Sequence, residues 1–191
     1  MKIIKQALTE YDPRIDEWDE PVVRNFNGKK VIGRPTKAYG TKSFEYAGKL
    51  YEPEPWSLSM QIIKMAAEYV VFKNLNKIVR FNFCLCGLYK DGSVSIPHHS
   101  DTVPTEEDLV VGVSFGGSRF MEWNQYDTPI KEHTNTSEID TKLNWSLQKT
   151  YLLNHGDVYV FDGKSQMNST HAILPTEEAK ERINLTFRTG I

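Results

Sequence analysis

The chain has 191 residues, of which 39% are hydrophobic and 25% are charged, and its formal net charge is −2. This composition is typical of one globular domain and excludes a disordered chain. The small net charge does not by itself indicate a nucleic-acid binder, so such a function has to rest on local residues. No apolar run approaches the roughly 18 residues that a membrane helix needs.

The N-terminus and the two cysteines bear on the cellular compartment. Residues 1–6 lack the apolar region of a secretory signal peptide. Cys84 and Cys86 are two residues apart in a β-prone run, so both point to one face and no disulfide framework is expected. We therefore expect an intracellular monomer, in the nucleus or the cytoplasm, with no membrane partner.

The N-terminal part, up to about residue 57, is rich in turns. Its clearest signal is residues 22–33, where two β-prone runs flank Asn27-Gly28, a pair that suits a type I′ turn. The pattern predicts a β-hairpin with Phe26 at its tip. A short helix is also expected over Tyr11 to Trp18.

The strongest helical pattern runs from Ser57 to Asn74, with Ser57 as a candidate N-cap. Three- and four-residue spacing predicts that one face packs on the core. That face consists of Leu58, Ile62, Met65, Ala66, Tyr69, Val70 and Lys73.

Short β-prone runs follow this helix to the end of the chain. They cover residues 81–89, 110–115, 119–123, 149–153, 157–161 and 183–187. Residues 124–145 are polar and aperiodic, and we expect a long surface loop there. One helix followed by about eight short strands predicts an α+β fold with a β-sandwich or jelly-roll core.

Candidate metal ligands occur in His99-Ser100-Asp101. In an extended segment, residues i and i+2 point the same way, so one imidazole and one carboxylate can converge on a cation. A third ligand from a distant strand, with His171 available, would complete a facial triad with open positions. Taken alone, the H-x-D pattern is a weak signal and is more typical of a surface histidine beside an aspartate.

The segment 182–188, Arg-Ile-Asn-Leu-Thr-Phe-Arg, strengthens this hypothesis. On a strand, Ile183, Leu185 and Phe187 face one side, and two arginines with an asparagine and a threonine face the other. Guanidinium groups spaced along a strand suit a small dicarboxylate. The alternative is an exposed edge strand with a solvated polar face.

These motifs together resemble the AlkB family of iron(II)- and 2-oxoglutarate-dependent dioxygenases, especially its double-stranded DNA repair members. The resemblance covers residues 22–188, and the R-x-N-x-T-x-R pattern of residues 182–188 is its most specific part. Supporting stretches are residues 35–40, 81–83, 89–92, 99–101, 113–116 and 155–157.

The resemblance implies a double-stranded β-helix in a single domain, residues 1–191. Residues 1–57 would form a substrate-recognition extension that carries the hairpin, and residues 58–191 the helix and the catalytic core. His99, Asp101 and His171 would bind iron(II). Arg182 and Tyr89 would bind the far carboxylate of 2-oxoglutarate, with Asn184 and Arg188 near its metal-chelating end, and dioxygen would be the second cosubstrate.

The resemblance also implies which residues would bind the substrate. Tyr46 would stack on a flipped base, Phe44 would form a second wall of the base pocket, and Phe26 would fill the gap that the base leaves. Basic residues around this hairpin would contact phosphates: Arg24, Lys29, Lys30, Arg34, Lys37 and Lys42. The alternatives are that Phe44 and Tyr46 both pack on the core, and that the lysines only keep an edge strand soluble.

Two positions depart from the family pattern. Gly87 stands where the family usually has an asparagine that contacts 2-oxoglutarate, and we expect Gly87→Asn to leave binding unchanged or to tighten it. Thr102 and Val103 follow the H-x-D motif where many repair members have an acidic residue that reads the base, so base preference does not transfer.

The sequence therefore predicts an oxidative demethylase of N-alkylated bases that acts on N1-methyladenine and N3-methylcytosine in DNA and releases formaldehyde. The alternatives are an RNA demethylase, another 2-oxoglutarate-dependent hydroxylase, or a base-binding module without catalysis.

Overall fold

The computed structural model describes residues 12–26, 29–46, 49–101, 109–127, 145–162 and 165–189. Before the helix come β1 (Val23–Phe26), β2 (Lys29–Ile32), β3 (Thr36–Gly40), β4 (Phe44–Tyr46) and β5 (Lys49–Tyr51). Helix α2 (Leu58–Leu75) is followed by β6 (Phe83–Tyr89), β7 (Ile96–His99), β8 (Leu109–Gly116) and β9 (Arg119–Tyr126). The chain continues with β10 (Trp145–Leu153), β11 (Val158–Asp162), the 3₁₀ turn η2 (Ser165–Met167), β12 (Ser169–Ile173) and β13 (Arg182–Arg188).

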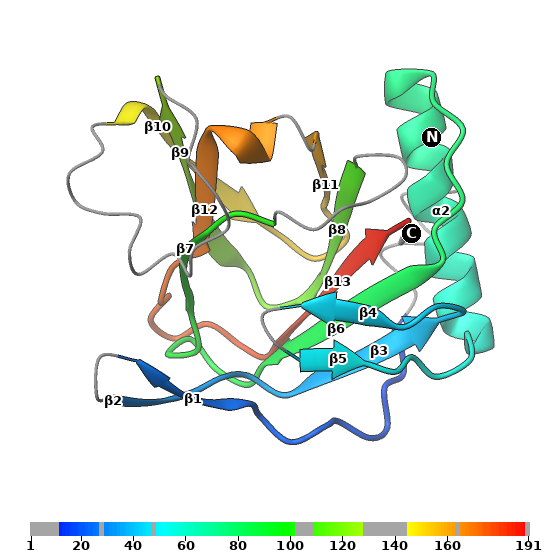
Figure 1. The fold of residues 1–191 in the computed structure, drawn as a ribbon, viewed down its shortest axis with the longest axis horizontal. Coiled ribbons are helices and arrows are strands. Elements are labelled where there is room, and N and C mark those ends of the chain that lie inside the picture. The colour runs from blue at the N-terminus through cyan, green and yellow to red at the C-terminus, as the bar shows by residue number, and fades with distance from the viewer. Residues whose placement is uncertain are drawn as a thin grey trace.

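Two antiparallel sheets form the body of the protein. The larger has the strand order β11-β8-β13-β6-β3, and the smaller has the order β10-β9-β12-β7. Figure 1 shows the two sheets facing each other, with α2 along the outside of the larger one. The non-sequential strand order is that of a jelly roll, so the predicted fold class is confirmed. Residues 36–40, within the expected extension, form the edge strand β3 of the larger sheet.

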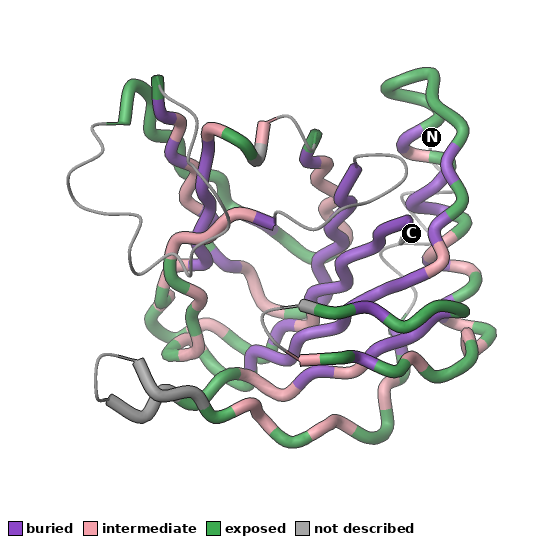
Figure 2. The backbone as a smooth tube through the Cα atoms, viewed as in Figure 1, coloured by how far each residue is buried: buried purple, intermediate pink, exposed green. Residues whose placement is uncertain are grey.

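The larger sheet is buried on both faces. Its outer face packs on α2 in a cluster that includes Cys84, Val113 and Leu185, while residues of the inner face, such as Tyr89, belong to a second cluster between the sheets. Figure 2 shows this sheet as the most continuously buried part of the tube. Cys84 and Cys86 are both buried and free, as expected. Because side chains alternate along each strand, one face of this sheet packs on α2 and the other faces the space between the sheets.

The predicted helix is confirmed, but its predicted buried face is wrong. Ser57 is the N-cap and its hydroxyl accepts a hydrogen bond from the Met60 amide at 3.2 Å. Leu58 and Met65, expected in the core, are 74% and 65% exposed. The residues that α2 buries are Met60, Ile63, Ala66, Ala67, Glu68 and Val71. The helix is apolar on both sides, so its periodicity could not identify the side that contacts the sheet.

Two further expectations need correction. Residues 12–18 are not helical, and Arg14 adopts a positive φ of 49°. The predicted loop over 124–145 begins too early, because β9 continues to Tyr126 and pairs with Trp145 at the start of β10. Residues 128–144 and Tyr11 lie outside the described residues.

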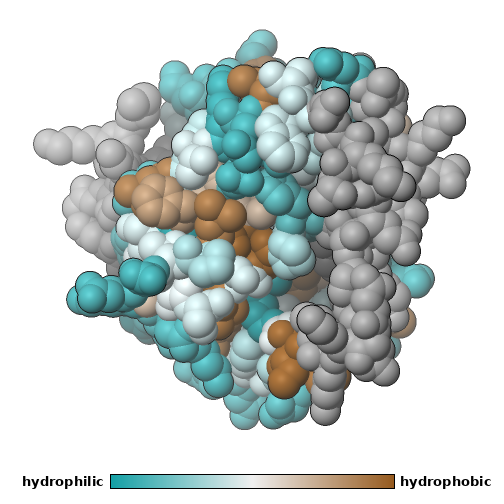
Figure 3. Space-filling view, turned by 90° about the vertical axis from the view of Figure 1, so that its left-hand side faces the viewer, coloured by the Kyte–Doolittle hydropathy of each residue, from teal (hydrophilic) through white to brown (hydrophobic). Residues whose placement is uncertain are grey.

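The predicted hairpin is present as β1 and β2, in which Phe26 pairs with Lys29 across the two-residue connection. A second hairpin, β4 and β5, covers part of the inner face of the larger sheet through Phe44 and Tyr51. Figure 3 shows the side of the molecule that carries β10 and β7, where a band of apolar residues crosses a largely hydrophilic face. Within the described residues, no helix is long and apolar enough to cross a membrane.

Candidate active site

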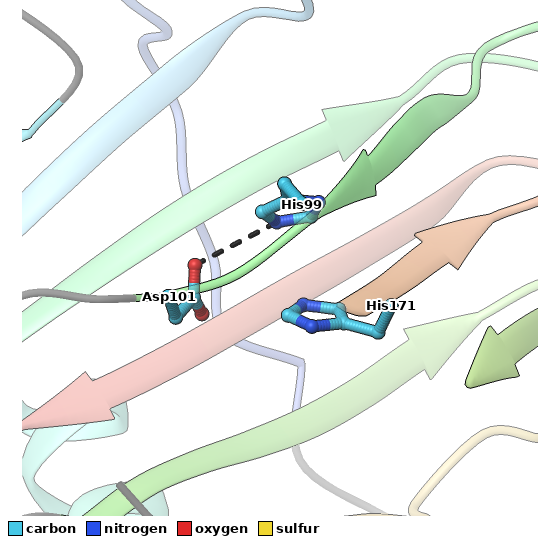
Figure 4. A group of neighbouring side chains, drawn as sticks. All are labelled: His99, Asp101 and His171. Atoms are coloured by element: carbon cyan, nitrogen blue, oxygen red, sulfur yellow. Dashed lines mark ion pairs between the residues drawn. The ribbon is translucent and has the colours of Figure 1, made fainter. Parts of the chain in front are cut away.

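Three side chains from two strands and one adjoining loop converge between the sheets. His99 ends β7, Asp101 follows two residues later, and His171 of β12 is paired with His99 across the ladder. Their candidate ligand atoms all lie within 4.8 Å of one another, and His99 Nε2 is 3.6 Å from Asp101 Oδ1. Figure 4 shows the two imidazoles and the carboxylate turned toward one common point. Two imidazoles and one carboxylate on a single side form the facial donor set that suits iron(II).

Hydrogen bonding and packing orient the two imidazoles. His99 Nδ1 lies 3.0 Å from the Pro97 carbonyl oxygen, and a proton held there leaves the lone pair of Nε2 directed at the metal position. The ring of His171 packs 4.5 Å from Phe161 and lies nearly parallel to Trp123. These contacts fix the orientation of both imidazoles.

The electrostatics of the site favour metal binding. Burial and, to a smaller extent, the neighbouring His99 lower the pKa of His171 to about 3, so the ring is neutral near pH 7. Burial also lowers the pKa of His99, against the opposing effect of Asp101. Burial alone would raise the pKa of Asp101, but the Arg188 guanidinium and the two histidines bring it well below its usual value. Two neutral imidazoles and an ionised carboxylate are the required protonation states.

The polar face of β13 is buried, because β13 lies in the middle of the larger sheet between β8 and β6. The alternative of an exposed edge strand is therefore wrong. Arg182 is fully buried, its Nε donates to Ser114 Oγ at 2.8 Å, and its Nη2 donates to Asn184 Oδ1 at 2.9 Å. At the other end of the strand, Arg188 Nη2 donates to Asp101 Oδ2 at 2.8 Å. Asn184 thus contacts Arg182, and Arg188 contacts a candidate metal ligand.

Several buried polar atoms of this face have no hydrogen-bond partner among the described residues. They include the Tyr89 hydroxyl and Arg182 Nη1, and the Arg182 guanidinium carbon lies 4.9 Å from the Tyr89 ring centroid. A buried donor without an acceptor is costly, and a bound carboxylate would satisfy both groups. The residues present therefore fit 2-oxoglutarate beside an iron ion.

Sequence reasoning missed several residues of this space. Ser114 is the one polar residue in the apolar run 109–115, a pattern that could have marked it. Tyr159 of β11 packs directly over Gly112 and donates to Asn184 Oδ1 at 2.9 Å. Arg119 is fully buried and donates to the carbonyl oxygens of Ser118 and Asp91. Burial lowers the pKa of Arg119, and the charge of Arg182 lowers it further.

The expected substrate residues have mixed positions. Phe44 is 7% exposed and stacks on Phe83 with ring centroids 4.8 Å apart, which favours the packing alternative for this residue. The Arg188 guanidinium carbon lies 5.6 Å from the Phe44 ring centroid, so the ring borders the candidate active site. The side chains of Tyr46 and Phe26 lie outside the described part of the structure.

Two of the basic residues expected around the hairpin contact other parts of the protein. Lys37 forms ion pairs with Glu54 and Asp19, and the hydrogen bond to Glu54 raises its pKa. Arg34 points toward the inner face of β6, where its guanidinium carbon is 5.2 Å from the Tyr89 ring centroid. Lys42 is exposed, and the side chains of Arg24, Lys29 and Lys30 lie outside the described residues.

Comparison with known families agrees with the geometry. The 2OG-Fe(II) oxygenase superfamily profile matches residues 2–188, and the chain belongs to this superfamily. Its iron(II), 2-oxoglutarate and dioxygen chemistry suits the residues described above. Several curated relatives of the chain carry names of alkB homologs.

Two curated relatives and one solved structure illustrate the similarity. The human alpha-ketoglutarate-dependent dioxygenase alkB homolog 3 is 28% identical over 97% of this chain and 54% of its own length. The uncharacterized protein R406 of Acanthamoeba polyphaga mimivirus is 28% identical over 98% of this chain and 87% of its own length. A structure described as "The structure of OsALKBH1" has a TM-score of 0.61 at 16% identity and covers 98% of this chain and 90% of that one. The chain spans about half the length of the mammalian relatives it matches.

Proposed function

We propose that the protein is an iron(II)- and 2-oxoglutarate-dependent oxidative demethylase of N-alkylated nucleic-acid bases. Its expected lesions are N1-methyladenine and N3-methylcytosine in DNA. The observation that carries the proposal is the position of His99, Asp101 and His171 beside the buried guanidinium groups of β13. This combination provides a metal site and a dicarboxylate site in one enclosed space.

When bound, iron and 2-oxoglutarate supply the oxidation that inserts one oxygen atom of dioxygen into a C–H bond of the N-methyl group, with succinate and carbon dioxide as co-products. The resulting hydroxymethyl group leaves as formaldehyde and returns the proton to the base nitrogen. The chain's own residues bind, orient and exclude water. Arg182 and Tyr89 hold the far carboxylate, and Arg188 fixes Asp101.

The N-terminal hairpins support a nucleic-acid substrate. A base in a duplex cannot reach metal ligands buried between two sheets, so it must leave the stack. The β1–β2 hairpin places Phe26 next to a two-residue connection, where an aromatic residue could enter the stack. Phe44 borders the site through Arg188, and Tyr46 on the same strand is the proposed stacking residue.

The decisive experiment measures succinate and formaldehyde from methylated oligonucleotides in the presence of iron(II), ascorbate and 2-oxoglutarate. Duplex DNA, single-stranded DNA and RNA with the same lesion are compared, with unmethylated strands as the control. We expect stoichiometric formaldehyde and succinate with methylated DNA. Turnover on RNA alone would mean that the substrate is RNA and not DNA. If none of these substrates gave formaldehyde while 2-oxoglutarate was still consumed, a hydroxylase of another substrate class would replace the proposal.

A further inference from the structure

Gly87 leaves room for an arginine from elsewhere in the chain. On the inner face of β6, an added Cβ at residue 87 would overlap Nε of Arg34 and would lie 3.0 Å from the Cζ and Nη2 of the same guanidinium. Arg34 belongs to the segment just before β3, and Pro35 next to it accepts a hydrogen bond from the Leu88 amide. Arg34 therefore occupies a space that exists only because residue 87 has no side chain.

This arginine faces the same ring as the predicted cosubstrate anchor. The guanidinium carbons of Arg34 and Arg182 lie 5.2 and 4.9 Å from the Tyr89 ring centroid. Nε of Arg34 is buried and has no hydrogen-bond partner among the described residues. Two guanidinium groups around one ring repel each other, and a buried N–H without an acceptor adds to the cost. An anion bound between the two guanidinium groups would reduce their repulsion and accept a hydrogen bond from the unsatisfied N–H.

The strand register indicates which part of such an anion Arg34 would meet. Along the β6–β13 ladder, Tyr89 pairs with Arg182, Gly87 with Asn184, and Phe83 with Arg188. Arg188 in turn donates to Asp101, so the Arg188 end of the ladder lies at the candidate metal site and the Arg182 end lies away from it. Residue 87 lies between these ends. Arg34 is therefore on the metal side of Arg182.

We propose that Arg34 is a cosubstrate-binding residue that replaces the side chain missing at Gly87. Its guanidinium donates to the carboxylate next to the keto group of 2-oxoglutarate, while Arg182 and Tyr89 hold the far carboxylate. Arg34 is then a cosubstrate contact from the segment before β3, outside the β13 motif.

The first test measures 2-oxoglutarate binding by calorimetry to the full chain loaded with Zn(II), which does not support turnover. We expect Arg34→Ala to weaken binding by at least about tenfold, because a charge-assisted hydrogen bond is lost. Lys90→Ala is the matched control, since it removes one positive charge from an exposed position next to Tyr89 in the sequence. Equal affinities for Arg34→Ala and the control would overturn the proposal. Because the assay contains no nucleic acid, its outcome does not depend on the substrate proposed above.

A second ligand identifies the carboxylate that Arg34 contacts. 2-Oxopentanoate keeps the keto acid but lacks the far carboxylate. With this ligand the loss caused by Arg34→Ala should persist, whereas the loss caused by Arg182→Ala should disappear. If the Arg34→Ala loss also disappeared, Arg34 would serve the far carboxylate and the assigned position would be wrong.

The double variant Arg34→Ala/Gly87→Asn tests whether Arg34 takes the place of a side chain at residue 87. Gly87→Asn in the otherwise unchanged chain has to displace Arg34, so the expectation of unchanged or tighter binding no longer holds and we expect weaker binding. In the Arg34→Ala background the same asparagine enters free space and should restore part of the lost affinity. Additive losses in the double variant would contradict the replacement. Thermal unfolding of all variants confirms that the affinity changes are not folding defects.

Discussion

At the scale of single residues, the site depends on charges that are buried and mutually neutralised. Asp101 and Arg188 form an ion pair in which both side chains are nearly inaccessible to water. Removing one partner of such a pair leaves the other buried and uncompensated, at a cost of roughly 3–5 kcal/mol. Substitutions here therefore change both ligand binding and stability, and the two effects need separate measurements.

Loss of any metal ligand should abolish turnover. His99→Ala, Asp101→Ala and His171→Ala each leave two ligands, which cannot hold iron(II) in an open facial geometry. Succinate release measures the loss. Asp101→Asn keeps an acceptor for Arg188 and separates the loss of the metal ligand from the stability effect, while Asp127→Ala, at an exposed bend, is the control. Near-normal turnover by Asp101→Ala would remove this residue from the ligand set.

Arg182→Ala should sharply raise the 2-oxoglutarate concentration needed for turnover. A fully buried guanidinium that loses contact with a desolvated carboxylate corresponds to roughly 2–5 kcal/mol in binding free energy. The measurement is the 2-oxoglutarate dependence of succinate release. An unchanged requirement would show that another buried cation, such as Arg188, anchors the far carboxylate.

At the scale of the elements, packing on the larger sheet determines which side of α2 is buried. Glu68 is largely buried, accepts a hydrogen bond from the Phe81 amide at 2.9 Å, and pairs with Lys64 at 2.6 Å. This polar contact lies on the buried side of the helix, together with Met60 and Val71. The opposite side keeps Leu58 and Met65 exposed. The sheet therefore selects the side of α2 that also satisfies a backbone amide.

Two methionines on opposite sides of α2 test this assignment with the same substitution. Met60 is fully buried and Met65 is 65% exposed. We expect Met60→Ala to lower the free energy of unfolding by about 2–5 kcal/mol. Met65→Ala should change it by no more than about 0.5 kcal/mol. Denaturant titration distinguishes them, and similar losses for both variants would mean that the exposed side is covered in solution.

The β1–β2 hairpin gives a prediction about strandedness. If Phe26 enters the base stack, its ring offsets part of an unstacking cost of a few kcal/mol per step, which arises only in a duplex. Phe26→Ala should therefore reduce turnover on methylated duplex DNA far more than on the same lesion in single-stranded DNA. Phe72→Ala, an exposed phenylalanine on α2, is the control. Equal losses on both substrates would indicate a general binding role, and no loss would favour a single-stranded substrate.

At the scale of the whole molecule, the candidate ligands join segments that are distant in sequence. His99 of β7 and His171 of β12 belong to the smaller sheet, and Asp101, which follows β7, is bound by Arg188 of the larger sheet. A metal ion and a dicarboxylate bound here would connect the two sheets. Any ligand that binds only the folded state stabilises it by mass action.

Zn(II) or Mn(II) together with 2-oxoglutarate should therefore raise the Tm. At ligand concentrations about 100 times Kd the stabilisation is about 2.7 kcal/mol. For a chain of this size this corresponds to a shift of roughly 5–10 °C. Thermal unfolding with and without a chelator measures the shift. Asp101→Asn should lose most of it, and an equal shift in that variant would place the metal elsewhere.

Much of the site follows from the sequence because strand geometry is local. Residues two apart on a strand share a face, so the pairing of His99 with Asp101 and the polar face of Arg182 to Arg188 could be predicted without knowing any neighbour. The N-cap at Ser57 and the hairpin around Asn27-Gly28 have equally local causes.

The tertiary structure decided whatever depends on a distant partner. The buried side of α2 was set by the sheet it packs on, since the helix offers apolar residues on both sides. The inward position of Arg34 depends on the space above Gly87, which lies far along the chain on β6. Local periodicity reports which residues share a face, whereas the contact that covers that face is a property of the packed chain.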